Sequence, residues 1–494
     1  MRSTFAGLQM GLRALQAHQM GLSVTGHNIA NANTEGYSRQ RINLVPGNPY
    51  TVPAFNKPLS PGQMGTGVQV ADIKRVRDEF IEMQLRMESQ TTGQWQVLMD
   101  GYEQVEMIFN EPSDTGISST MTAFWKSWQQ LSLTPADLPA RAVVRQTGAL
   151  LADAISHTYT QLHRYREEID SAIGVKVNRI NYLAQQVADL NKQIVAVAVS
   201  GDNPNDLLDA RDLIVKELAQ IANIQAVTDE ELQMHISISG SSLVQGSHVS
   251  KLALKEDPQG FRVVWEGTRD VNAVFNGGEL KGLFQLRDDI LRDGYMAELD
   301  RLAQAIVEKV NEVHRQGYGF DASVDDSDLD GRYPTGKDFF AAPADSDNWA
   351  GRWAQDMRLA DDILQEDGLK YIAAGKLAEG SEEAPGNGDN ALAIANLLQE
   401  AKVDALNGSI PDFLASLIAS LGVDSQESQR MLANQTVLME HLERRQEAVS
   451  GVALDEEMGN LIRFQHAYNA AARLITALDE TLSTVIERMG IVGR

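Results

Sequence analysis

Apolar residues recur at coiled-coil spacing at both ends of the chain. Near the N-terminus they form one line of seven-residue steps and a second, shorter line: Leu8, Leu15, Leu22 and Ile29, with Phe5 and Leu12 before Gln19 and Gly26 interrupt it. Toward the C-terminus the steps of three and four residues are uninterrupted: Leu461, Phe464, Tyr468, Ala471, Ile475, Leu478, Leu482, Val485, Met489 and Val492. Both series predict helices with an apolar stripe. Because isolated helices are marginal in water, each end needs a partner, either the other end or another subunit.

The N-terminal helix is predicted to end in a turn built from asparagine and glycine. Asn28, Asn31 and Asn33 tolerate left-handed backbone angles, and Gly36 adopts them freely. We therefore expect the helix to stop within this stretch and to lead into a turn.

Long helical segments surround a shorter β-rich stretch in the middle of the chain. The helices are expected at 74–109, 117–133, 139–199, 206–221, 281–314, 390–403 and 411–450. Residues 232–239 alternate with period two, and similar short runs at 251–254 and 261–265 predict further strands. A Gly- and Asp-rich, irregular region precedes 388.

These elements predict a mainly α-helical, elongated, multidomain protein with an inserted β-rich module and outer α+β parts. The terminal heptad helices are expected to pair as a coiled coil at one pole, next to a helical rod. The expected divisions are a terminal segment and linker (1–60), the first part of the rod (61–221), the β-rich module (222–280), a mixed outer module (281–410), the second part of the rod (411–450) and the C-terminal segment (451–494).

Composition narrows the classes of partner. The chain has 494 residues with 43 Lys+Arg against 68 Asp+Glu, a net charge of −25, which disfavours nucleic acid and anionic lipid. No apolar run approaches the roughly 18 residues of a membrane span, so we expect no membrane insertion. There is no cysteine, which excludes disulfides, thiolate metal sites and a cysteine nucleophile. The start lacks the features of a secretory signal peptide, so the chain either stays inside the cell or leaves uncleaved.

Two motif-like stretches fall in one acidic loop, 321–338. Asp326, Asp328 and Asp330 match the first ligand positions of an EF-hand calcium loop, but Lys337 stands where a bidentate Glu is required. A solvated acidic loop is the simpler interpretation. Residues 331–338 have Walker-like spacing, but Asp338 replaces the Ser or Thr that reaches Mg²⁺ and no buried strand precedes it, so no nucleotide site is predicted.

Nothing in the sequence argues positively for catalysis. The nine histidines show no His-Glu-x-x-His pattern, and no Gly-x-Ser-x-Gly elbow marks a nucleophile. We therefore predict no catalytic residue, no cofactor and no zinc site, and we favour an assembly protein over an enzyme.

Both termini carry a signature. Residues 21–39, GLSVTGHNIANANTEGYSR, and 450–473, SGVALDEEMGNLIRFQHAYNAAAR, resemble the paired signatures of bacterial flagellar rod, hook and hook-associated proteins. Internal segments are most similar to the FlgK family of hook-filament junction proteins: 204–212 (PNDLLDARD), 277–288 (GGELKGLFQLRD), 311–317 (NEVHRQG) with 338–340 (DFF), and 388–395 (GDNALAIA).

The resemblance implies a structural subunit of the hook-filament junction whose terminal helices fold into the axial tube on assembly. The implied partners are the hook protein, other hook-associated proteins, further copies in a ring, the type III export apparatus and an export chaperone that binds the C-terminal helix at 461–492. It also implies an extracellular place in the flagellum, reached without cleavage. The expected assembly residues are Phe5, Leu8, Leu12, Leu15, Leu22, Asn28, Ile29, Asn31, Gly36, Tyr37, Leu461, Phe464, Tyr468, Ile475, Leu478, Leu482, Val485 and Met489.

Three alternatives stay open at this point. Within the resemblance, the chain could be a hook or rod subunit. Outside it, the chain could be a cytosolic coiled-coil scaffold, or a calcium-dependent adhesin or enzyme that uses the acidic loop.

Overall fold

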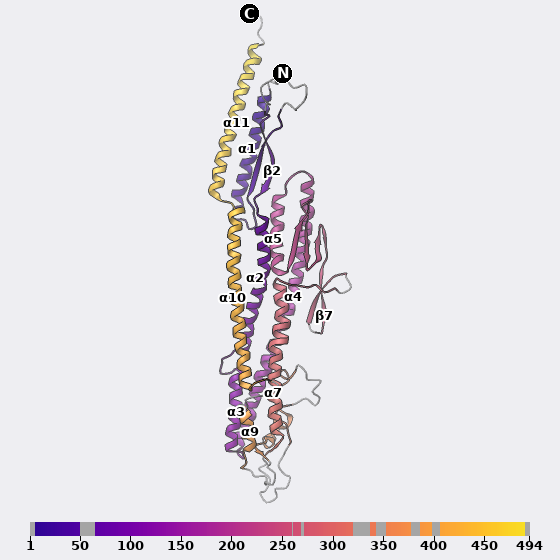
Figure 1. Ribbon diagram of the computed structural model, residues 1–494, viewed down its shortest axis with the longest axis vertical. Helices are drawn as coiled ribbons and strands as arrows, with labels where there is room; N and C mark the ends of the chain where they lie inside the picture. Colours follow the sequence, from indigo (N-terminus) through magenta and orange to yellow (C-terminus); the bar gives the residue numbers. More distant parts are fainter. Residues whose placement is uncertain are drawn as a thin grey trace.

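The computed structural model describes residues 5–49, 65–258, 260–267, 271–319, 336–341, 352–376, 386–397 and 406–489. The molecule is long and narrow, and its first and last helices lie together at one pole (Figure 1). The predicted fold class, mainly α with small β-sheets in an elongated body, is confirmed.

The pole with the termini contains two helices and a hairpin. Helix α1 (Ala6–Ala30) lies against α11 (Leu454–Met489). Strands β1 (Gln40–Pro46) and β2 (Val68–Arg75) form an antiparallel hairpin on another face of α1. The helix predicted from residue 74 therefore starts too early, because Lys74 and Arg75 belong to β2. The alternation of Ile42 with Leu44 was a period-two signal for this hairpin.

The rod is built from antiparallel helices. Helix α2 (Glu79–Phe109) begins where the Asp78 carboxylate accepts the Phe80 amide at 2.9 Å, and it packs along α10 (Ile410–Ser450). Helix α4 (Leu138–Val199) and α5 (Asn205–Ile221) lie beside them. The segment predicted at 281–314 is helical as α6 (Glu279–Phe284), the π-helical η1 (Gln285–Met296) and α7 (Ala297–His314), with a kink at Gly294.

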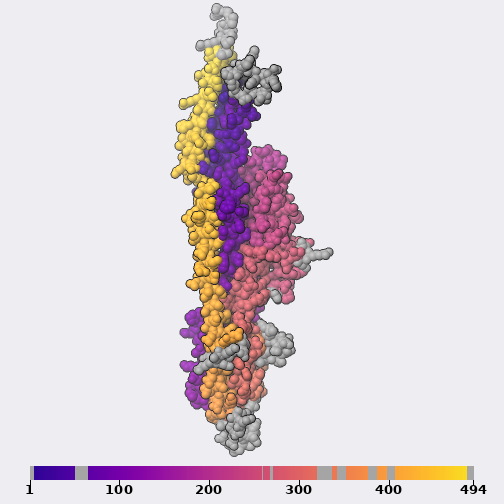
Figure 2. All heavy atoms as spheres, viewed as in Figure 1, coloured from indigo at the N-terminus to yellow at the C-terminus, as the bar shows by residue number. Residues whose placement is uncertain are grey.

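The β-rich module covers the region where the alternation predicted it. Strands β3 (Ile224–Thr228), β4 (Met234–Ile238), β5 (Ser241–Gln245) and β6 (His248–Val249) form one sheet, and β7 (Leu252–Asp257) with β8 (Gly260–Trp265) forms a hairpin. The buried Asn191 of α4 fixes this module, because its amide donates to the carbonyls of Met234 (2.9 Å) and Gly246 (2.7 Å). The module protrudes from one side of the rod (Figure 2).

The opposite pole packs around an aromatic cluster. Helix α3 (Ile117–Leu133) and α9 (Asp389–Asn396) lie here with the short elements β9 (Gly317–Tyr318), α8 (Asp361–Leu364), η3 (Gly368–Tyr371) and β10 (Gly375–Lys376). The rings of Phe124, Trp128, Phe339 and Phe340 contact one another and are fully buried. The helix predicted over 390–403 ends at Asn396 within α9, and 398–405 lie outside the described residues.

A buried, neutral histidine, His314, links segments of the chain at this core. His314 is buried; its Nε2 accepts the Ala373 amide at 2.9 Å, while Nδ1 donates to the Lys337 carbonyl at 2.7 Å. Burial lowers the pKa of His314 to about 4. The imidazole therefore joins three segments only while it is uncharged.

Candidate functional site

The two terminal helices approach each other closely through glycines. A Cβ at Gly11 would lie 2.8 Å from Ile475, and a Cβ at Gly21 would lie 2.8 Å from the Phe464 ring. Gly7 faces Leu478 in the same way, so the two helices run antiparallel. Glycine at these positions removes the Cβ that would separate the backbones.

The predicted stripe on α11 is the face that contacts α1. Phe464 and Ala471 are buried, and the other members of the stripe are half-buried: Leu461, Tyr468, Ile475, Leu478 and Leu482. Val485 and Met489 belong to α11, but their side chains lie outside the described residues. Pairing of the two ends, one of the two options that the pattern left open, is confirmed.

The contact face of α1 differs from the predicted one. The residues that meet α11 include Gly7, Gly11, His18, Gly21 and Asn28. The predicted apolar residues follow this contact line by one position along the helix. We call them the leucine ridge: Leu8, Leu12, Leu15, Leu22 and Ile29. Leu12 remains 50% exposed and Phe5 58% exposed, and the other ridge residues are half-buried. The bulky side chains of α11 fit against glycine, which displaces the leucines to the flank.

Asn28 is the centre of a buried polar junction at the C-terminal end of α1. Its side-chain amide donates to the Gln40 carbonyl (2.9 Å) and to Glu457 Oε2 (3.1 Å). Its oxygen accepts the Gln40 amide (3.0 Å) and the Tyr37 hydroxyl (2.7 Å). Asn28 is 1% exposed and Glu457 2% exposed, so one asparagine joins α1, the following turn and the start of α11.

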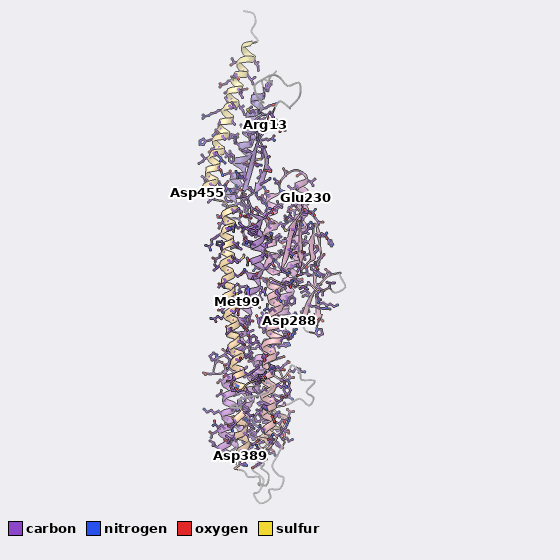
Figure 3. All side chains as sticks on the ribbon, in the orientation of Figure 1. Arg13, Met99, Glu230, Asp288, Asp389 and Asp455 are labelled. Atoms are coloured by element: carbon purple, nitrogen blue, oxygen red, sulfur yellow. The ribbon has the colours of Figure 1, made fainter. Side chains whose placement is uncertain are left out.

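Arg39 completes the link to α11. Its guanidinium donates to Glu457 Oε1 at 2.9 Å and to Glu456 at 2.8 Å. Its backbone amide donates to the Ser450 carbonyl at 2.8 Å, where α10 ends. The bend between α10 and α11, which Figure 3 marks by Asp455, is therefore held by the turn that follows α1.

A second cluster ties the same turn to the rod. The Ser38 amide and hydroxyl both donate to Asp209 of α5, at 2.9 and 2.8 Å. Arg75 at the end of β2 donates to Asp209 (2.7 Å) and Asp212 (2.8 Å), and Arg77 donates to Asp212 and pairs with Glu82 (2.7 Å). Buried or half-buried charges of opposite sign thus connect the hairpin, α5 and α2.

The electrostatics of this junction favour the observed protonation states. Burial raises the pKa of Tyr37, and the carboxylates of Asp206, Asp209 and Glu457 raise it further, so its hydroxyl stays a donor. Burial lowers the pKa of Arg77, but Asp212 and Glu82 more than compensate and raise it overall.

The other predicted site residues in this turn have local roles. Asn31 ends α1, and its amide donates to the His27 carbonyl at 3.0 Å. Gly36 has a φ of +78° and lies against Leu213. The sequence patterns did not point to Asp209, Asp212, Arg75, Arg77 or the inward-facing glycines as site residues. Asp209 and Asp212 lie in a segment that carried the resemblance, so a signal for them existed.

No group of metal ligands occurs among the residues that the structure describes. Asp326, Asp328 and Asp330 lie outside those residues. Lys337, from the Walker-like stretch, pairs with Asp362 at 3.0 Å. In the described part of the chain, no helix has the length and apolar character to cross a membrane.

Three family models match the chain. Residues 102–340 match the flagellar hook-associated protein FlgK helical domain. Residues 8–37 match the flagella basal body rod protein model, and residues 446–488 match the C-terminal model of flagellar basal body rod FlgEFG proteins. The two terminal matches cover the segments that the polar junction brings together.

Relatives match over the whole length. Flagellar hook-associated protein 1 of Bacillus subtilis (strain 168) is 32% identical over 524 residues that cover 100% of both chains. The chain belongs to the flagellar hook-associated protein 1 (FlgK) family. The FlgK family member of Escherichia coli (strain K12) is 29% identical over 96% of this chain and 98% of its own. The flagellar hook junction protein FlgK from Burkholderia pseudomallei has the same fold, with a TM-score of 0.60 at 17% identity over 74% of this chain and 100% of its own.

Membership of the FlgK family makes the chain a component of the bacterial flagellum with a structural role at the hook-filament junction. Its relatives are structural flagellar proteins rather than enzymes.

Proposed function

We propose that this chain joins the flagellar hook to the filament by inserting the α1–α11 pair into the axial tube, where the leucine ridge packs against neighbouring subunits. The observation that supports this most is the exposure of the ridge. Leu12 is half-exposed, although α1 already packs against α11 through its glycine face. Burying a leucine or isoleucine from the fully exposed state contributes about 1.5–3 kcal/mol, and the five ridge residues keep only part of their exposure, so covering the ridge favours assembly by a fraction of that amount for each residue.

The polar junction gives this insertion a defined geometry. Asn28, Arg39 and Ser38 connect the terminal pair to Glu457 and to Asp209 of the rod. A pair attached through several buried hydrogen bonds keeps a fixed angle to the rod, which a load-bearing joint requires.

The finer assignments are part of the same proposal. The partners are the hook protein, the next hook-associated protein and further copies of the chain in a ring. The chain is exported uncleaved by the type III apparatus, with an export chaperone on the C-terminal helix, and it has no catalytic activity. The terminal pair, the rod and the outer modules act as separate units. A hook or rod subunit is disfavoured because the internal match is to the FlgK helical domain.

Deleting the gene tests the role. We expect complete hooks without filaments, and unpolymerised flagellin in the medium. Complementation with Leu12→Asp should fail to restore filaments, because a buried carboxylate without a partner is costly. Val437→Asp, on the 64% exposed Val437 of α10, is the matched control and should restore them. Normal filaments after deletion would refute the junction role.

A further inference from the structure

Opposite flanks of the terminal pair differ in character. The leucine ridge follows the α1 contact line by one residue. On α11, Glu457 and Leu461 lie on the face toward α1, and Met458 and Ile462 follow them by one residue. Because each residue advances about 100° and the helices are antiparallel, these positions fall on the same side of the pair. Met458 and Ile462 are 51% and 49% exposed, so α11 extends the apolar flank.

The hairpin lies on the other flank, and a groove opens on α1 between the hairpin and the line of the leucine ridge, to which Gln19 belongs. Met10 and Arg13, one residue before the contact line, face Gly67 and Gly47 of the hairpin segment. An open groove of about 600 Å³ lies between α1 and β2; we call it the α1–β2 groove. Its lining residues are Arg13, Gln16, Ala17, Gln19, Met20, Ser23, Val68, Gln69 and Val70. On α1 they span 13–23, about 15 Å along the helix.

The charges of both surfaces are unusual for this protein. The chain carries a net charge of −25, yet its first 34 residues contain no Asp or Glu. Among the described residues that line the groove, Arg13 alone is charged, and the leucine ridge has no charged residue. Copies of a strongly acidic chain repel one another over most of their surface, so these neutral flanks are where two copies approach at least cost.

The ridge and the groove lie at the same height on the long axis. Leu15 and Leu22 lie within residues 13–23, the part of α1 that lines the groove, but on another face of the same helix. A contact between two different faces at one height relates copies mainly by rotation, and such head-to-tail contacts build closed rings or open helical arrays around an axis.

We propose that the leucine ridge of one copy inserts into the α1–β2 groove of the next copy, so that the hairpin is part of the contact between subunits. This rests on the proposed function, which supplies the assembled state. The hairpin then has a second role besides leading into α2, because Val68 and Val70 form one wall of the α1–β2 groove.

Disulfide crosslinking tests the contact directly, because the natural chain has no cysteine. The double variant Leu15→Cys with Gln69→Cys, oxidised in purified flagella, should give a ladder of crosslinked subunits. Co-expressed single variants should give dimers only. A second pair, Leu12→Cys with Gln69→Cys, covers the case in which Leu15→Cys does not assemble.

The controls separate the outcomes. Ile42→Cys with Ile73→Cys, paired in register across β1 and β2, reports oxidation within one chain. Dimers from Leu15→Cys alone would mean that ridge meets ridge and would overturn the inference. No crosslink in filament-bearing cells whose control pair oxidises would also overturn it, while the junction role would stand. Loss of the junction role would instead appear as normal filaments in the gene deletion.

Discussion

Replacing Asn28 by alanine should uncouple the terminal pair from the rod. The change removes two donor and two acceptor contacts from a site that is 1% exposed, and it leaves Glu457 Oε2, the Tyr37 hydroxyl and both backbone groups of Gln40 without this partner. A hydrogen bond between neutral groups contributes about 1 kcal/mol and one to a charged group about 2, so we expect a loss of about 5 kcal/mol.

Native-state hydrogen exchange on the full chain measures this loss. The informative amides are those of Ser38 and Arg39, which bond to Asp209 and Ser450 rather than to Asn28. About 5 kcal/mol corresponds to exchange faster by between three and four orders of magnitude if the junction opens as a unit.

Asn31→Ala is the matched control. Asn31 lies three residues away, is half-buried, and bonds mainly to His27 within its own turn. We expect less than about 1 kcal/mol and at most a fivefold change in exchange. The reasoning is refuted if Asn28→Ala changes the Ser38 and Arg39 amides no more than Asn31→Ala does.

Two further predictions concern helix packing and pH. Gly21→Leu should separate α1 from α11, because even its Cβ would meet the Phe464 ring, and filaments should be lost; Gly26→Ala, with nothing within 4 Å of its Cβ, should leave attachment intact and gain about 0.5–1 kcal/mol. The distal core should weaken in acid: the His314 pKa of about 4 lies below the unfolded value of 6.5, so the unfolded chain binds more protons as pH falls below 6.5. Urea melts followed by tryptophan fluorescence should lose about 2 kcal/mol between pH 7 and 5, and His314→Gln should flatten that dependence; an unchanged slope would contradict it.

The periodic elements were predictable because their signals are local. The helices at 117–133, 139–199 and 411–450 agree with α3, α4 and α10 to within one residue. Apolar spacing, breakers and caps such as Asp137 and Ser409 act over a few residues, so the sequence contains them directly. The hairpin was missed because its two strands are short and lie far apart in the chain, with residues 47–67 between them.

The polar junction was predictable only in part. The sequence singled out Asn28, Asn31, Gly36 and Tyr37, but as a helix end and a signature rather than as partners of particular groups. Their partners are distant: Asn28 bonds to Glu457, 429 residues away, and Ser38 to Asp209, 171 residues away. Pairings of this kind depend on how α5 and α11 pack, which no local pattern encodes.

By itself the sequence determined that both ends are helices with apolar stripes and that each stripe needs a partner. It did not determine which face of α1 meets α11. Two lines run along α1 one residue apart, one with leucines and one with glycines, and hydrophobic periodicity favours the leucines. In the tertiary structure the glycine line meets α11. Phe464, Ile475 and Leu478 fill the space in front of residues without a side chain, so the two backbones lie close together. The leucines were left on the flank of the pair, where Leu12 is 50% exposed and the others are half-buried.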